Sequence, residues 1–269
     1  DYLALLMDTP EPTHRKQSFE AYKEGRDAPP EDFSVQIPYL HELLEAFDCP
    51  AFSLPGYEAD DLIGTFSRKF SSPQTHVYIV SGDKDFFQLL SDQVTLYSPK
   101  KNDRLELVTP KEFHERFGLK PIQFIDCLAL MGDTADNIPG VRGIGEKGAA
   151  KLLQEFGSLE KIYENLEKVK PPKAQKALEE YRKEAFLSKE LATIEQKEVK
   201  ENLKNIEDLS GSGNIFGDGA DSILPFLPET AGGKTVNLRQ LQELIEKVNQ
   251  AGGIKKKESL FGMDTFEAG

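Results

Sequence analysis

Residues 77–86, VYIVSGDKDF, place two acids directly after a short apolar run that is rich in β-branched side chains. A run of this length, bounded by polar residues, is typical of a buried strand in a parallel sheet. In open α/β sheets, ligands bind at the carboxyl ends of the strands. We therefore predict that Asp83 and Asp85 lie at the ligand-binding edge of an α/β domain.

Three other segments carry acids in similar positions. Residues 3–7 (LALLM) form a second strand-like run that ends at an acid, and the segments GYEADD (56–61) and GDTADN (132–137) begin or follow expected helices. The candidate site residues are Asp8, Glu58, Asp60, Asp61, Asp83, Asp85, Asp133 and Asp136. If these carboxylates converge, they repel one another unless cations neutralise them.

The ligand chemistry of such a cluster favours hard cations. Carboxylate oxygens with no His or Cys nearby favour two Mg²⁺ or Mn²⁺ ions over zinc. Two such ions are the usual apparatus for cleaving phosphodiesters, since one activates water and the other stabilises the leaving oxygen. The alternative is that the acids are solvated helix caps and turn residues.

Hydrophobic spacing between these segments predicts helices. Apolar residues recur at helical intervals in 33–47, from about Glu58 onward, in 110–131, and near 174–181 and 183–192. Strands alternating with helices predict an α/β fold, in which a mostly parallel, twisted sheet is flanked by helices. The polar, Pro-flanked residues 10–32 cannot be core on this pattern, and we expect a mobile basic segment there.

Two segments are candidates for binding phosphates. In PGVRGIGEKG (139–148), glycines let the backbone approach a ligand, and a helix that starts near Glu146 would direct its amides at a phosphate. Helix-turn-helix packing without a ligand is the alternative. The lysines at 168, 170, 173 and 176 form either a phosphate-facing stripe or a solvated helix face.

Overall charge does not exclude a nucleic-acid partner. The net charge is −13, and residues 201–269 carry about −4 of it, so about −9 remains for residues 1–200. The eight candidate carboxylates supply −8 of that remainder, so bound metals would leave this part close to neutral and local basic patches would dominate. No apolar run is long enough to span a bilayer, and the two cysteines suit a cytoplasmic protein.

The segments GYEADDLIGTF, SGDKDFFQLLSD and LMGDTADNIPGVRGIGEKGAAKLLQEFGSLE resemble the 5′-nuclease domain of bacterial DNA polymerase I, within the flap endonuclease superfamily. The resemblance covers about residues 3–200. It implies a PIN-like nuclease core, a C-terminal helix–hairpin–helix subdomain, and a two-metal enzyme that removes 5′ flaps and primers from branched DNA during replication and repair.

The resemblance also implies roles for individual residues. Around the first metal it places Asp8, Glu58, Asp60 and Asp61, and around the second Asp83, Asp85, Asp133 and Asp136. It matches Tyr22, Lys23 and Arg26 to a basic arch that holds the 5′ end, and Gly143, Ile144, Gly145 and Lys147 to the duplex-binding hairpin. Arg15 and Lys16 of the basic segment and Lys151 of the helix after the hairpin are further DNA-binding candidates because of their charge. A monovalent cation at the hairpin belongs to the same expectation.

The chain departs from the family pattern at both ends. The family begins with a further strand ending in Asp, which we expect to be missing before the nuclease core at 1–110. The helical subdomain then covers 111–200, and 201–269 is predicted to be a flexible linker with one short helix. Residues 257–263 (KESLFGM) faintly resemble a sliding-clamp binding peptide, with a disordered end as the alternative. We expect a monomer associated with the bacterial nucleoid.

Two rival functions remain open at this point. Without the missing strand, the chain would recognise branched DNA and perform no chemistry. A Mg²⁺-dependent phosphatase acting on small esters would also use acids at strand ends, but it would not need the hairpin or the basic segment.

Overall fold

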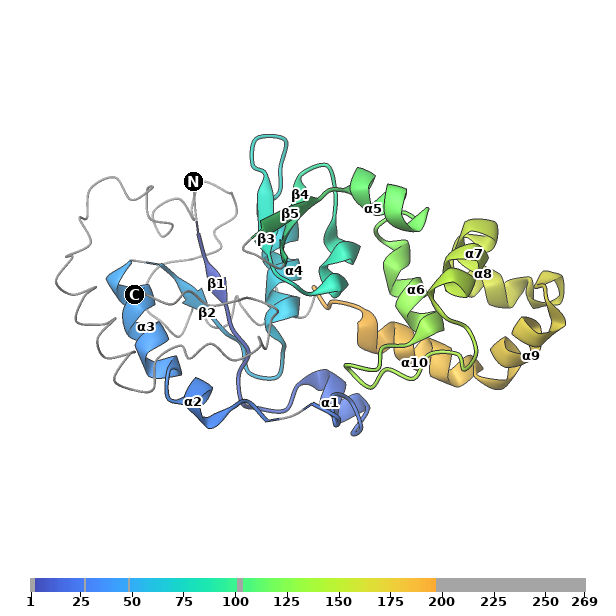
Figure 1. Ribbon diagram of the computed structural model, residues 1–269, viewed down its shortest axis with the longest axis horizontal. Helices are drawn as coiled ribbons and strands as arrows, with labels where there is room; N and C mark the ends of the chain where they lie inside the picture. Colours follow the sequence, from blue (N-terminus) through green and yellow to red (C-terminus); the bar gives the residue numbers. More distant parts are fainter. Residues whose placement is uncertain (1–2, 27, 48, 101–103, 197–269) are drawn as a thin grey trace.

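An α/β half and a helical half follow one another along the chain (Figure 1). The computed structural model describes residues 3–26, 28–47, 49–100 and 104–196. Within these ranges, the polypeptide runs from a pair of short strands through a second small sheet into a stack of helices. The expected linker, its short helix and the clamp-like peptide all lie outside the described residues.

The first sheet consists of two short parallel strands, β1 (Leu5–Leu6) and β2 (Ala51–Phe52). Between them the chain forms α1 (His14–Ser18), α2 (Glu31–Ser34) and α3 (Ile37–Ala46). The helix predicted over 33–47 is therefore two helices.

The second sheet has the order β3-β4-β5, with β3 (Val77–Val80) parallel to β4 (Val94–Lys100) and β4 antiparallel to β5 (Arg104–Val108). A 3₁₀ helix, η1 (Lys84–Leu89), connects β3 to the segment before β4. Sequence spacing did not predict the β4–β5 hairpin.

Helix α4 (Ala59–Phe70) packs against both β1 and β3, so one helix serves both sheets. The strands were expected to form a single, mostly parallel sheet. Two of the three strand pairings are parallel, but in the described residues β1 and β3 each have a hydrogen-bonded strand on one side only. The α/β class is confirmed, and the sheet is in two parts.

The helical half contains α5 (Pro110–Phe117), α6 (Gln123–Met131), α7 (Glu146–Phe156), α8 (Leu159–Glu164), η2 (Leu166–Lys168), α9 (Pro172–Glu180) and α10 (Arg182–Ala192). The helix predicted over 110–131 is broken because Gly118 ends α5 in the left-handed conformation, with φ of 65°. Thr109 begins α5 with a capping box that it shares with Glu112.

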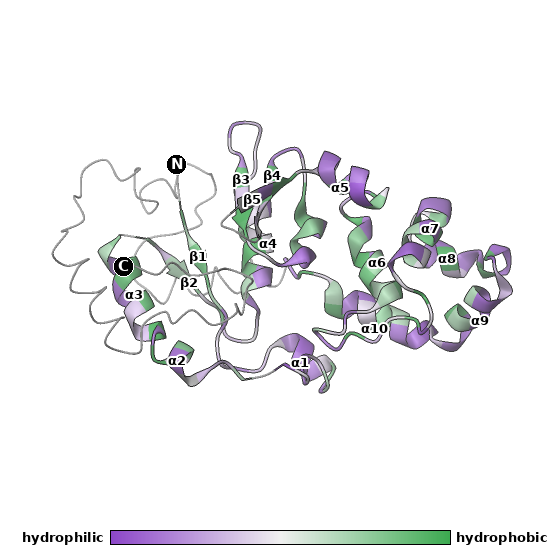
Figure 2. Cartoon of the chain, viewed as in Figure 1, coloured by the Kyte–Doolittle hydropathy of each residue, from purple (hydrophilic) through white to green (hydrophobic). Residues whose placement is uncertain are grey.

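Hydrophobic packing is concentrated around α6. Phe124, Cys127, Leu128 and Leu130 are at most 1% exposed, and they belong to a cluster that reaches from β3 to α10. Figure 2 shows this hydrophobic character along α6. By contrast, the cluster beneath β1 contains only two buried side chains, Leu54 and Leu62.

The segment after α10 returns to the α/β half. Gln88 of η1 donates to the Ala192 carbonyl at 2.9 Å and accepts from the Ile194 amide at 3.0 Å. The backbone of Gly64 lies so close to this segment that no side chain fits, because a Cβ at this position would be 2.5 Å from Ile194 Cγ2. This returning segment, residues 191–196, ties the two halves together.

The prediction for residues 10–32 is wrong in one respect. Although most of the segment is exposed, Arg15 is 3% exposed and Tyr22 is 4% exposed. Both side chains are buried because they contact acids of the candidate site. None of the helices in the described part of the chain combines the length and apolar character of a membrane span.

Candidate metal centre and nucleic-acid interface

The predicted acids occupy the ends of four elements. Asp8 follows β1, Glu58 is the N-cap of α4, and Asp83 is the N-cap of η1. Asp60 and Asp61 lie in the first turn of α4 and Asp85 in the first turn of η1, while Asp133 and Asp136 follow the Gly132 cap of α6. The local sequence favours these positions because short acids cap helix N-termini and complement the helix dipole.

A first group of carboxylates surrounds Asp60. Burial and the neighbouring carboxylates of Asp83, Glu58 and Asp8 raise the pKa of Asp60 to about 7, while Lys23 opposes the shift. Asp8 also accepts a 2.7 Å hydrogen bond from the Ala59 amide, so β1 and α4 are connected beside this group.

A second group surrounds Asp85. Burial and the carboxylates of Asp83, Asp136 and Asp133 raise the pKa of Asp85 to about 8, while Lys84 opposes the shift. Asp83 acts on both Asp60 and Asp85, so the two groups are continuous. Residues from sequence positions 8 to 136 thus interact within one acidic region.

Cations of the basic segment and of η1 cover this region. Lys23 Nζ lies 2.8 Å from Glu58 Oε1, Lys84 Nζ lies 3.0 Å from Asp133 Oδ2, and Arg26 is paired with Asp136. The Tyr22 hydroxyl donates to Glu58 Oε2 at 3.2 Å, and burial followed by the Glu58 charge raises the pKa of this phenol. Lys16 instead donates to the Tyr22 carbonyl at 3.1 Å.

Two of the predicted assignments do not fit the structure. The guanidinium of Arg15 donates to both oxygens of Asp61, at 2.7 and 2.8 Å, and to the carbonyls of Leu191 and Thr193. Asp61 is fully buried and also accepts from the Glu58 amide. Arg15 is therefore not placed to contact DNA, nor Asp61 to bind a metal, because each neutralises the other in the interior.

The acids other than Asp61 offer carboxylate oxygens, which are the ligands that hard divalent cations prefer. Within the described residues, no three His, Cys, Asp or Glu side chains surround one point closely enough to ligate an ion in this arrangement. One oxygen, Asp85 Oδ1, is nevertheless buried without a hydrogen-bond partner. Eight carboxylates face four contacting cations, Arg15, Lys23, Arg26 and Lys84, so four formal negative charges remain.

The glycine hairpin between α6 and α7 is anchored by backbone contacts. Asp133 and Ile138 exchange backbone hydrogen bonds of 2.9 and 2.7 Å, and the Gly140 amide donates to Ser188 Oγ at 2.9 Å. A Cβ on Gly140 would lie 2.3 Å from the Gly132 nitrogen. Gly132 and Gly140 are thus required for packing.

Gly143 and Gly145 differ from these two, because a Cβ on either would have no heavy atom within 4 Å. Gly145 is the N-cap of α7, and no side chain caps that helix terminus. Both glycines therefore face open space. The prediction that Ile144 contacts DNA is corrected for its side chain, which is 7% exposed and packs in the main hydrophobic cluster. Lys147 and Lys151 are exposed on α7.

Two basic residues beside these features, Lys84 and Arg142, were not among the site residues predicted from the sequence. Lys84 lies between Asp83 and Asp85, so its alternation with acids was the available signal. Arg142 lies in the glycine hairpin, and nothing in the neighbouring sequence indicates that its side chain lies near α9.

Two family descriptions match adjoining parts of the chain. Residues 1–118 match the family described as "5'-3' exonuclease, N-terminal resolvase-like domain", and residues 119–212 match "5'-3' exonuclease, C-terminal SAM fold".

Curated relatives are similar over most of the described residues. DNA polymerase I of Bacillus subtilis is 42% identical over 194 residues, which cover 72% of this chain and 22% of that protein. DNA polymerase I of Caldicellulosiruptor bescii is 45% identical over 197 residues, covering 72% and 23%. The chain therefore spans less than a quarter of the length of these relatives.

Solved structures of phage T5 nuclease have a similar fold. The T5 5'-exonuclease with bound zinc ions is 27% identical, with a TM-score of 0.59 over 70% of this chain and 72% of that one. A mutant of the T5 5'-exonuclease is 25% identical, with a TM-score of 0.61 over 76% and 83%.

Proposed function

Because this chain belongs to the 5'-3' exonuclease family, we propose that it hydrolyses phosphodiesters at the 5′ ends and flaps of branched DNA, with divalent cations as cofactors. The observation that carries the proposal is the acidic region itself, in which Lys23 Nζ lies 2.8 Å from Glu58 and 3.9 Å from Asp136, and Lys84 Nζ lies 3.0 Å from Asp133. Its residual formal charge of −4 equals the charge that two divalent ions neutralise.

The donor set supports Mg²⁺ or Mn²⁺, since only carboxylate oxygens are offered. Asp8, Glu58, Asp60 and Asp83 would hold one ion, and Asp83, Asp85, Asp133 and Asp136 the other. When bound, such ions supply a hydroxide near neutral pH and stabilise the leaving oxygen. The T5 5'-exonuclease, which is similar in fold, has been solved with divalent metal ions bound.

The cations over the acidic region would position the substrate. Lys23 and Arg26 pair with carboxylates through side chains that are 21% and 50% exposed. When a DNA phosphate and divalent cations bind, the cations neutralise the acids and the phosphate offers Lys23 and Arg26 a new anionic partner. Both side chains can then exchange their ion pairs with the acids for ion pairs with the phosphate. Tyr22 stays buried beneath them and holds Glu58 in place.

The open hairpin would hold the duplex. The backbone at Gly143 and Gly145, the uncapped N-terminus of α7, and the exposed Lys147 and Lys151 form a group that can bind phosphates without contacting base edges. This arrangement supports recognition of DNA by structure rather than by sequence.

The test removes single acids from each group. In Asp83→Ala and Asp133→Ala, cleavage of a 5′-flap duplex in Mg²⁺ should fall at least about a hundredfold, because the ions lose ligands. Flap binding in Ca²⁺ should persist, because the hairpin is intact. Asp92→Ala, which removes an exposed acid outside the site, is the matched control. Full cleavage by either site variant would contradict the proposal.

One observation favours the rival function, branched-DNA binding without cleavage. Strands β1 and β3 pack on the same helix, each has a paired strand on one side only among the residues that the structure describes, and Tyr78 and Val80 of β3 are 57% and 67% exposed. Such edges readily pair with another strand. The test first asks whether the unaltered chain binds flaps in Ca²⁺ but cleaves none in Mg²⁺. If it then gains cleavage when a strand-forming segment ending in Asp is fused before Leu3, the unaltered chain is a branched-DNA-binding protein without nuclease activity.

A further inference from the structure

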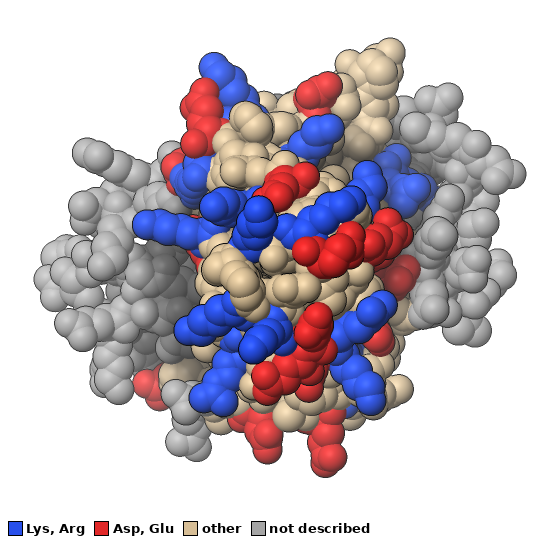
Figure 3. Space-filling view, turned by 90° about the vertical axis from the view of Figure 1, so that its right-hand side faces the viewer, with Lys and Arg blue, Asp and Glu red and all other residues tan. Residues whose placement is uncertain are grey.

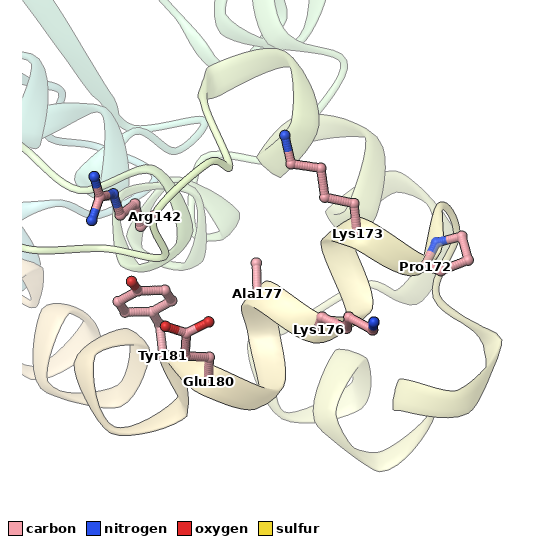
Figure 4. Close-up of a pocket in the computed structure, with 7 residues that line it drawn as sticks. All are labelled: Arg142, Pro172, Lys173, Lys176, Ala177, Glu180 and Tyr181. Atoms are coloured by element: carbon pink, nitrogen blue, oxygen red, sulfur yellow. The ribbon is translucent and has the colours of Figure 1, made fainter.

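Cations in the two halves of the molecule differ in what holds them. Arg142, Lys173 and Lys176 line a cleft of about 520 Å³ between the glycine hairpin and α9 (Figure 4), and within the described part of the chain none of the three forms an ion pair. Figure 3 views this end of the molecule directly and shows Lys and Arg side chains spread over it, with acids between them. Near the acidic region, by contrast, Lys23 and Arg26 are held in place by carboxylates.

Two neutral hydrogen bonds also join the basic segment to the loop that carries Asp136. The side-chain amide of Asn137 donates to the Ala21 carbonyl at 2.6 Å, and the backbone amide of Lys23 donates to the Asp136 carbonyl at 3.0 Å. The Asn137 contact bridges 116 positions of the sequence, so no local pattern indicates it. No role was predicted for Asn137 from the sequence.

The backbone on both sides of this contact has an uncommon conformation. Lys23 and Asn137 have φ angles of 56° and 55°, and in the part of the chain that the structure describes they are the two non-glycine residues with positive φ. The left-handed region is unfavourable for most residues, and Asn is among those that adopt it most readily. Such conformations persist where surrounding contacts require them, and they cluster at functional sites. Asn137 therefore supplies both the conformation and the donor that this contact needs.

The loop around Asn137 is the better-anchored partner in the contact. Asp133 and Ile138 exchange backbone hydrogen bonds, and the Ala135 amide donates to the Asp133 carboxylate at 2.9 Å. Ile138 is 4% exposed and belongs to the main hydrophobic cluster. Residues 24–26 of the basic segment, by contrast, are all exposed. The loop can therefore hold the segment in place, because the loop is fixed to the core.

The neutral bonds and the ion pairs respond differently to substrate. Phosphate and divalent cations would compete for the ion pairs that Lys23 and Arg26 make with the acids. An amide that donates to a backbone carbonyl carries no charge for which either ion competes. While the ion pairs exchange, the Asn137 contact therefore still fixes the backbone from which Lys23 and Arg26 project.

We propose that Asn137 is a positioning residue, which holds the basic segment against the acidic region so that Lys23 and Arg26 meet the phosphate at the site of cleavage. The inference rests on the proposed function, since it deepens the account of that same site. Preorganised groups lower the barrier of the chemical step, and a small misplacement of such groups is costly. Loss of the Asn137 amide should therefore reduce turnover at saturating DNA rather than binding of the duplex.

The first test measures cleavage of a 5′-flap duplex in Mg²⁺. Asn137→Gly leaves the left-handed backbone unstrained and removes the amide donor. Its kcat should fall roughly tenfold, while its KM stays within about twofold of that of the unaltered chain. Asn165→Gly is the matched control, because the Asn165 amide donates to the Lys161 carbonyl at 2.9 Å in the helical half, and its kcat and KM should not change. An unchanged kcat for Asn137→Gly, or a loss confined to KM, overturns the inference.

A combined variant separates positioning from a general structural role. In Lys23→Gln/Arg26→Gln, the side chains that Asn137 positions are absent. Adding Asn137→Gly to this background should lower the single-turnover cleavage rate by less than about twofold, because residues that act through one another are not additive. A further tenfold fall in this background would show that Asn137 acts by another route, and the inference would be wrong.

Amide hydrogen exchange tests the contact without metal or DNA. In EDTA, the Lys23 amide should exchange at least about tenfold faster in Asn137→Gly than in the unaltered chain or in Asn165→Gly, because the segment opens more often. Equal exchange rates overturn the inference and leave the proposed function standing. If the unaltered chain cleaves no flap, the proposed function fails, and the exchange rates alone decide whether Asn137 holds the segment.

Discussion

The helical half and the α/β half of this protein are stabilised in different ways. Around α6, Phe, Leu and Ile side chains fill a cluster in which many are at most 1% exposed. The second sheet of the α/β half joins this cluster through Ile79, Leu96 and Val108, whereas in the described residues the cluster beneath β1 has only Leu54 and Leu62 as its buried hydrophobic side chains. Around the acids of this half the contacts are charged: Arg15 with Asp61, Lys23 with Glu58, and Lys84 with Asp133. The difference shows that the half carrying the acids uses charge both for structure and for its proposed chemistry.

This comparison has a physical rationale. Carboxylates that must bind cations cannot be surrounded by hydrocarbon alone, because an unpaired buried charge is costly. The α/β half therefore keeps cations beside its acids and shares one hydrophobic cluster, through β3, β4 and η1, with the helical half. Contacts of the returning segment 191–196 with Gln88 and Asp61 make that neighbour part of the same folding unit.

The largest expected effect is in the aromatic core. Phe124 is 1% exposed, with ring centroids of Phe87, Phe113 and Phe117 at 5.3–5.7 Å. Phe124→Ala should lower the free energy of unfolding by about 3–5 kcal/mol, as lost burial and a cavity add together. Leu54→Ala, in the smaller cluster, should cost about 2 kcal/mol. Urea unfolding measures both, and equal losses would contradict the comparison.

Arg15 gives the next largest effect and tests the role of charge. Arg15→Ala leaves Asp61 buried without its cation, which should cost about 3 kcal/mol. Arg182 of the helical half stacks on Tyr163 and Phe186 at 5.0 and 5.9 Å, so Arg182→Ala should cost less than about 1 kcal/mol. Denaturant unfolding of the two variants checks the ranking, and a larger loss at Arg182 would show that the halves are not distinguished in this way.

A pair of buried hydroxyls provides the smallest and most closely matched comparison. The Tyr22 hydroxyl donates to the Glu58 carboxylate at 3.2 Å, whereas the Tyr163 hydroxyl donates to the Leu178 carbonyl at 3.1 Å. Bonds to charged acceptors are stronger, so Tyr22→Phe should cost about 1.5 kcal/mol and Tyr163→Phe about 1 kcal/mol. Thermal unfolding under identical conditions resolves the difference; the reverse order would count against charge as the stabilising element of the α/β half.

Parts of the fold were predictable because their signals are local. The apolar run at 77–80 forms β3, the spacing after Glu58 forms α4, and the glycines at 143 and 145 form an open turn before α7. The break between α5 and α6 was missed although Gly118 marked it, because hydrophobic spacing continued across the glycine.

Other parts were not predictable from local pattern. The β4–β5 hairpin was missed, and Ile144 was assigned to DNA although it packs into the core. Ile144 is buried because it joins a cluster whose other members come from distant parts of the chain, which no neighbouring residue signals. The position of Arg142 beside Lys173 likewise arises only when the hairpin and α9 are brought together.

By itself, the sequence determined which residues are acids, their order along the chain, and their placement after apolar runs or at helix starts, since these depend on neighbours within a turn or two. Only the tertiary structure decided which charges are satisfied. Arg15 meets Asp61 across 46 positions and the Leu191 carbonyl across 176, whereas Arg142 and the lysines of α9 form no ion pair with any acid in the described part of the chain. Ion pairing and burial are properties of distances in space, so they are fixed when the two halves pack together.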